Sequence, residues 1–252
     1  MDSDDDVIPA KVSCVSCGTA LTAKSRFCNI CGAHQSGVNL KELESRWPLF
    51  KQAALFYVIC IVSCALPKYI DYFDTTFWDF FFEVFLWANI IFFFAINWKE
   101  NKKLLSWKNF SWQNLCAYLA ITITGALIVH YAMAWLNVVI FPDNEFFVES
   151  KGGGLLCGAL LIFFTAVTPA IFEELGFRGY LMQNLLKISD THQAIYVTAF
   201  LFAIIHLQII GLVWLLPLAV FLGYIRVKEG TLWYGIFIHF AFNLTACAFQ
   251  FF

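Results

Sequence analysis

Charged residues are scarce in this chain. Asp, Glu, Lys and Arg make up only 13% of its 252 residues, and 60% are hydrophobic, whereas a soluble domain is typically about 25% charged. This composition excludes an ordinary soluble domain and predicts an all-α polytopic membrane protein. No basic stripe is present, so nothing indicates a nucleic-acid partner. The first residues, MDSDDD, are acidic, so we expect no cleavable signal peptide.

Long uncharged or nearly uncharged stretches recur after the first 46 residues. A helix needs about 20 such residues to cross a bilayer. The predicted spans cover residues 48–67, 77–97, 112–140, 154–172, 193–209, 211–225 and 231–251. The segment 173–187 continues the fourth span past Pro169, so we expect seven transmembrane helices, or eight if it forms a separate half-helix. The predicted parts are a polar segment, 1–46, and a transmembrane domain, 47–252.

Lys and Arg are distributed unevenly among the predicted loops. Thirteen fall in the N-terminal tail and in every second loop, and two, Lys68 and Lys151, fall in the alternate loops, which are acidic. Loops rich in Lys and Arg stay in the cytoplasm. The pattern predicts seven spans in the cell membrane, with the N-terminus in the cytoplasm and the C-terminus outside.

The polar N-terminal segment contains two C-x-x-C-G sequences, with ten residues between the second and third cysteines. Their cysteines are Cys14, Cys17, Cys28 and Cys31. Four thiolates can bind one tetrahedral Zn²⁺ in a closed structural site, and the glycines permit tight turns. A disulfide or a redox C-x-x-C is the alternative, but a cytoplasmic location and two matched motifs disfavour both. The segment resembles the small zinc ribbons appended to many bacterial and archaeal membrane proteins.

Three apolar segments near the C-terminus carry ionisable or polar side chains, which are costly at membrane depth and need a partner or a function. These are Glu173, Glu174 and Arg178, then Phe202 and His206, then His239 and Asn243. Glu174 and Arg178 are four residues apart on one helix face, so we expect them to form an ion pair. Glu173 lies about 100° round the helix and lacks a local cation, which suits a general base.

Phe202 and His206 also share a helix face, so we expect the phenyl ring to support the imidazole. His239 and Asn243 share a face as well, and two hydrogen-bond donors aimed at one point are typical of an oxyanion hole. Any one of these residues could simply bridge membrane helices. Together, two carboxylates, two imidazoles and an amide on three helices predict a hydrolytic site.

The motifs E-E-x-x-x-R, F-x-x-x-H and H-x-x-x-N, in this order, resemble the CPBP (Abi, or CAAX-protease) family of intramembrane endopeptidases. The resemblance covers about residues 150–250. It implies that Glu173 and His206 activate a water and that His239 and Asn243 stabilise the oxyanion. It also implies a membrane-associated or lipidated protein or peptide as substrate, since members include prenyl endopeptidases and proteins linked to bacteriocin maturation and self-immunity.

Three alternatives remain at the level of sequence. Glu173, His206 and His239 could be zinc ligands of a metalloprotease, although no H-E-x-x-H is present and the histidines lie on different helices. We favour water activated by glutamate without metal, following the family, and so expect no cofactor at the active site. A non-catalytic scaffold and a proton-coupled transporter are the others. Every catalytic position is filled, which argues against a scaffold. No inverted repeat is evident between the two halves of the chain, which argues against a transporter.

Overall fold

The computed structural model describes residues 11–14, 16–22, 27–33, 40–108, 110–140 and 155–251. The chain divides into two compact units, Met1–Pro48 and Leu49–Phe252. In the first unit, strands β1 (Lys11–Ser13) and β2 (Ala20–Thr22) form an antiparallel pair in which Val12 lies opposite Leu21. This hairpin carries the first two cysteines of the predicted ribbon.

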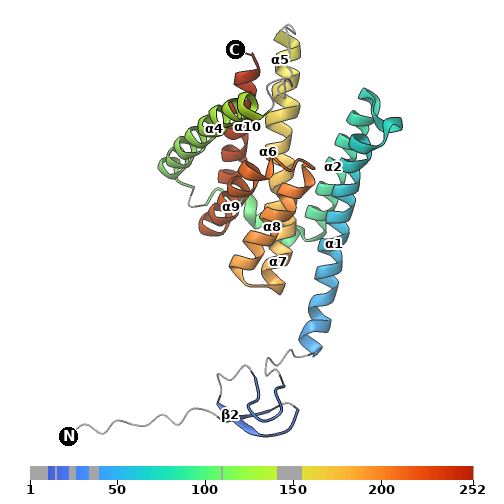
Figure 1. Ribbon diagram of the computed structural model, residues 1–252, viewed down its shortest axis with the longest axis vertical. Helices are drawn as coiled ribbons and strands as arrows, with labels where there is room; N and C mark the ends of the chain where they lie inside the picture. The colour runs from blue at the N-terminus through green and yellow to red at the C-terminus, as the bar shows by residue number, and fades with distance from the viewer. Residues whose placement is uncertain are drawn as a thin grey trace, which may run out of the picture. The chain divides into compact units, whose positions relative to one another are not determined.

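The second unit is built of helices. Its long helices in the described residues are α1 (Leu40–Tyr69, which begins before the unit), α2 (Thr76–Ile96), α4 (Trp112–Ile140), α8 (Thr191–Ile205), α9 (Leu212–Glu229) and α10 (Trp233–Phe251). A short helix, α3 (Trp98–Asn101), follows α2. Figure 1 shows α1 and α2 on one flank, α4, α9 and α10 on the other, and the segment from α5 to α7 between them.

The central segment is one continuous helical stretch. It consists of α5 (Leu155–Ile162), the π-helix η3 (Phe163–Val167), α6 (Thr168–Glu173), the π-helix η4 (Glu174–Leu181) and α7 (Met182–Ile188). The segment 173–187 is therefore not a separate half-helix, because the chain stays helical through Glu173 and Glu174. π-helical turns within α-helices are frequent at functional sites, and η4 contains the E-E-x-x-x-R motif except for its first residue.

Four helices within the described residues are long and apolar enough to cross a membrane. They are Arg46–Tyr69, Thr76–Ile96, Trp112–Leu136 and Gly158–Ile188, and two shorter apolar helices are Thr191–Ile205 and Trp233–Phe249. These correspond to the first, second, third, fourth, fifth and seventh predicted spans. The fifth ends at Ile205 rather than at residue 209, because Leu207 has a left-handed backbone, with φ of 53°.

Aromatic packing places η4 at the centre of this unit. Phe56 of α1 contacts Phe93 of α2 at 5.4 Å between ring centroids, and Phe177 and Tyr180 of η4 at 6.1 and 5.2 Å. Nearly all of η4 is buried, including Glu174 and Arg178. The fold thus takes charged side chains into an apolar interior, where they need partners.

Candidate active site

The buried carboxylate of Glu174 is paired. Arg178 donates from Nη1 to Oε1 of Glu174 at 2.8 Å, and neither residue is exposed. Arg178 also donates from Nη2 to the carbonyl of Ala219 in α9 at 3.2 Å. The ion pair predicted from the i, i+4 spacing is confirmed, and it satisfies two charges that would be costly to bury singly.

The same carboxylate also contacts α10. Nδ1 of His239 lies 3.1 Å from Oε1 of Glu174, and because a carboxylate only accepts, the imidazole donates. Gly235, one helical turn earlier, permits this approach, since a Cβ there would lie 2.7 Å from Oε2 of Glu174. Sequence reasoning missed the Glu174–His239 contact. The glycine four residues before His239 on the same helix face was the available signal.

Glu173 differs from its neighbour. Its Oε2 has no hydrogen-bond partner among the described residues, and Nε2 of His239 lies 3.7 Å away. The Glu173 side chain is 23% exposed, whereas that of Glu174 is 1% exposed. Glu173 also lines a cavity, and a carboxylate oxygen without a hydrogen-bond partner is able to accept a proton from a bound water.

His206 caps the C-terminal end of α8. Its Nδ1 lies 2.9 Å from the carbonyl oxygen of Phe202, and since a carbonyl only accepts, Nδ1 carries the proton. In the neutral ring Nε2 then holds the lone pair, so this nitrogen is an acceptor. The hydrogen bond fixes the tautomer of His206 and turns its basic nitrogen away from the helix backbone.

The ring of Phe202 touches three polar groups of the site. Its centroid lies 4.9 Å from that of His206 and 5.9 Å from that of His239, and the guanidinium carbon of Arg178 lies 4.3 Å from it. The predicted support of His206 by Phe202 is therefore confirmed. The cation–π contact with Arg178 was not foreseen, because it joins separate helices.

Asn243 donates to a backbone carbonyl that lies four residues before a proline. Pro169 has no N–H to donate to the carbonyl of Thr165, four residues earlier, and Nδ2 of Asn243 donates to this oxygen at 3.1 Å. An amide nitrogen has two N–H donors, so the second stays available. Asn243 and His239 thus have different partners, Thr165 and Glu174, rather than a shared one.

Glu173, the candidate general base, lines two cavities. Glu173, His206, His239 and Asn243 all line a cavity of about 420 Å³, whose wall also includes Pro169. Glu173 and His206 also line a second cavity of about 280 Å³ against α1. Glu174 and Arg178 line neither of these cavities. The structure therefore brings four of the six predicted catalytic residues to one cavity and places the other two behind His239.

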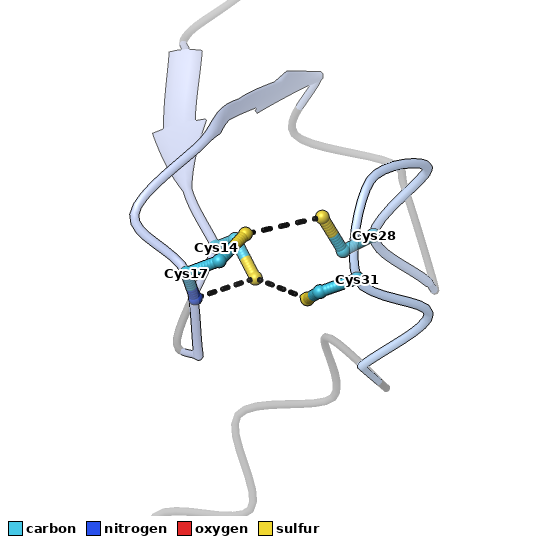
Figure 2. Close-up of side chains that lie close together, drawn as sticks. All are labelled: Cys14, Cys17, Cys28 and Cys31. Carbon is cyan, nitrogen blue, oxygen red and sulfur yellow. Dashed lines mark hydrogen bonds between the residues drawn. The ribbon is translucent and has the colours of Figure 1, made fainter.

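The four N-terminal cysteines converge in the first unit, as Figure 2 shows. Their sulfur atoms all lie within 4.8 Å of one another, with Cys14 and Cys31 3.7 Å apart and Cys17 and Cys28 3.6 Å apart. Tetrahedral zinc–sulfur bonds of about 2.3 Å require sulfur–sulfur distances of about 3.8 Å. The four-cysteine cluster is consistent with a zinc ribbon.

The two cysteine motifs have the same backbone geometry. Gly18 and Gly32 have left-handed φ angles of 74° and 71°, and their N–H groups donate to the carbonyls of Cys14 and Cys28 at 3.0 and 2.9 Å. The backbone N–H of Cys17 is the main group that lowers the pKa of Cys14, to about 6. The pKa of Cys31 is raised instead, to about 11, so the matched turns and the sulfur spacing, rather than the thiol pKa values, favour a metal site.

The donor atoms of Glu173, His206 and His239 do not form a comparable cluster. Across the described segments, the ribbon thiols are the one group of three or more metal-type ligands whose donor atoms lie within 4.8 Å of one another. This spacing disfavours the alternative in which the two histidines and Glu173 bind a catalytic zinc.

The second unit is thus a multi-pass membrane protein with a buried carboxylate–imidazole pair beside a polar cavity. Residues 155–245 match the family described as "Type II CAAX prenyl endopeptidase Rce1-like". The chain therefore carries an Rce1-like domain of the CAAX prenyl endopeptidase (CPBP) family, a family of intramembrane endopeptidases. The resemblance inferred from the three motifs is confirmed, and the buried Glu174–His239 pair fits the catalytic site of such an enzyme. No curated protein and no solved structure shows a significant match to the chain.

Proposed function

We propose that the protein hydrolyses a peptide bond in a membrane-associated or lipidated protein or peptide, using a water activated by Glu173 and His206. The observation that carries this proposal is the meeting of Glu173, His206, His239 and Asn243 at one cavity. Protein or peptide substrates follow from the family. A general base and hydrogen-bond donors around one cavity are what water attack on a carbonyl requires.

In the proposed reaction, the water oxygen attacks the carbonyl carbon while its proton passes to the carboxylate of Glu173. His206 accepts the second O–H of this water through Nε2 and orients it. The oxyanion of the tetrahedral intermediate takes hydrogen bonds from Asn243 and from His239, whose Nε2 donates when the ring carries both protons. The C–N bond then breaks, and Glu173 returns its proton to the leaving amine. Glu174 holds His239 through Nδ1.

The proposal can be tested with full-length protein in lipid nanodiscs and a quenched fluorescent peptide. The peptide carries a farnesylated cysteine before its last three residues, and the same peptide without the farnesyl group is the control. Cleavage of the farnesylated peptide alone would assign a prenylated substrate, and cleavage of both would assign a broader one. The proposal is wrong if neither is cleaved and cells with the wild type show no new peptide ends relative to cells with Glu173→Gln.

Asn243→Ala is expected to lower kcat by about 10²–10³-fold, the usual effect of removing an oxyanion donor. Gln208 lines the same cavity but has no assigned role, so Gln208→Ala is the matched control and should stay close to wild type. Rates on the cleaved peptide and thermal unfolding should be measured together. Equal loss of kcat in both variants, or a loss explained by unfolding alone, would contradict the role of Asn243.

We also propose that the N-terminal segment, residues 1–46, is a cytoplasmic zinc ribbon whose Zn²⁺ is structural. Support comes from the four converging thiols and from the matched glycine turns. Four protein ligands leave no open position on zinc, so this metal would serve folding rather than catalysis.

Purified protein is expected to contain one Zn²⁺ per chain by elemental analysis, provided that reductant is present and chelator is absent. Cys28→Ser should lose this zinc, because a three-thiol site binds more weakly. Cys116→Ser is the matched control, since Cys116 is an exposed thiol of α4 outside the ribbon. Zinc-free wild type, or equal zinc in both variants, would refute the ribbon.

We further propose seven crossings, with the N-terminus in the cytoplasm and the C-terminus outside. Two of the thirteen Lys and Arg residues assigned to the cytoplasmic side do not belong to loops, because Arg178 and Arg226 are buried within helices. Arg226 donates to the carbonyl of Arg178 and to Gln183, so it serves packing rather than a loop. Without these two, eleven Lys and Arg residues remain on the predicted cytoplasmic side and two on the outer side.

Reporter fusions at the two ends of the chain test this arrangement. The expected result is a cytoplasmic reporter signal at residue 1 and a signal from outside the membrane at residue 252, because loops rich in Lys and Arg remain inside. Cytoplasmic signals from both ends would favour an even number of crossings. A fusion in the loop 102–108, which contains three lysines, is the internal control and should report from the cytoplasm.

A further inference from the structure

Helix α1 lies outside the region that matches the family, residues 155–245, yet it reaches the candidate site. The cavity of about 280 Å³ is lined by Cys60, Cys64 and Lys68 of α1 together with Glu173 and His206. A second contact joins α1 to α8, where the hydroxyl of Tyr57 donates to the carbonyl of Leu201 at 3.2 Å. Part of the environment of His206 thus comes from a segment that the family match does not include.

The turn that carries His206 is strained. His206 is the C-cap of α8, and the next residue, Leu207, has φ of 53°. Among the described residues, Leu207 is the one residue other than glycine with a positive φ. This position after a helix is usually taken by glycine, and a branched side chain stays there only where its surroundings hold it.

Lys68 binds this turn directly. Its Nζ donates to the carbonyl of Leu207 at 2.8 Å and lies 3.4 Å from the carbonyl of His206. Carbonyls at the end of a helix have no helical N–H partner, and an ammonium group has three donors to offer. The lysine therefore satisfies two free carbonyls at the residue that carries the imidazole and at the strained residue after it.

We propose that Lys68 is a positioning residue that clamps the His206–Leu207 turn and so holds the imidazole of His206 against Glu173. The inference rests on the proposed function for its effect on catalysis. It adds a role for α1, because the hydrogen bond to Phe202 orients the ring only relative to α8, whereas Lys68 ties the end of α8 to a different helix.

Kinetics on the farnesylated peptide, with full-length protein in nanodiscs, provide the first test. Lys68→Met keeps the length of the side chain but removes the donors, and should lower kcat by about 10- to 100-fold with KM unchanged, because small misplacement of a reacting group has effects of this size. Lys68→Arg should restore most of kcat. Tyr57→Phe, which removes the hydrogen bond from Tyr57 of α1 to Leu201 of α8, is the matched control and should keep the wild-type kcat.

A double-variant cycle tests whether Lys68 acts through the strained turn. Leu207→Gly relieves the strain, since glycine adopts positive φ without penalty. Lys68→Met should therefore lower kcat less in the Leu207→Gly background than in the wild type. Equal losses in the two backgrounds would mean that the effects add independently, and would overturn the proposed route.

Nuclear magnetic resonance of protein with ¹⁵N-labelled histidine needs no substrate. The His206 ring signals, assigned by their loss in His206→Gln, should broaden or shift in Lys68→Met, recover in Lys68→Arg and stay unchanged in Tyr57→Phe. An unchanged His206 signal in Lys68→Met, or a wild-type kcat in that variant, overturns the proposal. A wild type that cleaves neither peptide and produces no new peptide ends in cells contradicts the proposed function alone, and the histidine spectra still decide the role of Lys68.

Discussion

Glu173→Gln is expected to lower the cleavage rate by about 10²–10⁴-fold, the range that a general base typically contributes. Glutamine keeps the shape of the side chain but cannot take a proton from water. The Oε2 of Glu173 has no hydrogen-bond partner in the described part of the chain, so the substitution breaks no hydrogen bond of that oxygen. Protein yield and thermal unfolding should therefore stay close to wild type while cleavage stops.

Glu100→Gln is the matched control for this change. Glu100 pairs with Lys187 away from both cavities and is about half exposed, so the same loss of charge there should leave the rate unchanged. Cleavage by Glu173→Gln at the wild-type rate would show that Glu173 is not the general base. Unfolding of the variant would instead assign Glu173 a structural role.

Glu174→Gln is expected to lower protein level, stability and activity together. The change leaves the guanidinium of Arg178 buried without its countercharge, and breaking a buried ion pair from one side typically costs about 3–5 kcal/mol. It also removes the charged acceptor of the His239 Nδ1–H. Fluorescence-detected size exclusion and thermal unfolding measure the first effect, and peptide cleavage measures the second.

A double variant separates the two roles of this pair. Glu174→Gln with Arg178→Met removes both charges, and replacement of a whole buried pair is often nearly neutral for stability. We expect this variant to regain much of the lost stability but not the activity, because His239 stays without its carboxylate. Full recovery of activity would show that Glu174 has no part in holding His239.

The sequence predicts contacts within one helix well. The Glu174–Arg178 pair and the Phe202–His206 contact depend only on helical spacing, and both are present. The turns of the two cysteine motifs were equally predictable, because two residues between the cysteines and a following glycine define one local turn. Such contacts are fixed by the backbone geometry of a single segment.

Contacts between helices were not predictable in the same way. Periodicity indicates which face of a helix is polar but not which partner it meets, so the Glu174–His239 and Lys68–Leu207 contacts emerged only from the fold. The contact of Asn243 with Thr165 is intermediate. Pro169, which cannot donate to this carbonyl, was visible in the sequence, but the helix that supplies the donor was not.

The early end of α8 has a similar explanation. The apolar run continues to residue 210 apart from Gln208, so hydropathy alone extends the helix past His206. The left-handed turn at Leu207 ends it instead, and Lys68 from α1 donates to the carbonyl of that residue. A leucine at this position carries no local signal for a helix end, because the contact that holds it is distant in sequence.

The most direct test of water activation by Glu173 and His206 is the metal dependence of the membrane domain. Residues 1–46 are deleted to remove the ribbon zinc, and cleavage of the farnesylated peptide is measured after exhaustive chelation and again after Zn²⁺ is added. The proposed mechanism predicts the same rate before and after chelation, no gain with Zn²⁺, and no cleavage by Glu173→Gln in any condition. Loss of activity on chelation that returns with Zn²⁺ would make Glu173, His206 and His239 metal ligands and would contradict the proposed mechanism.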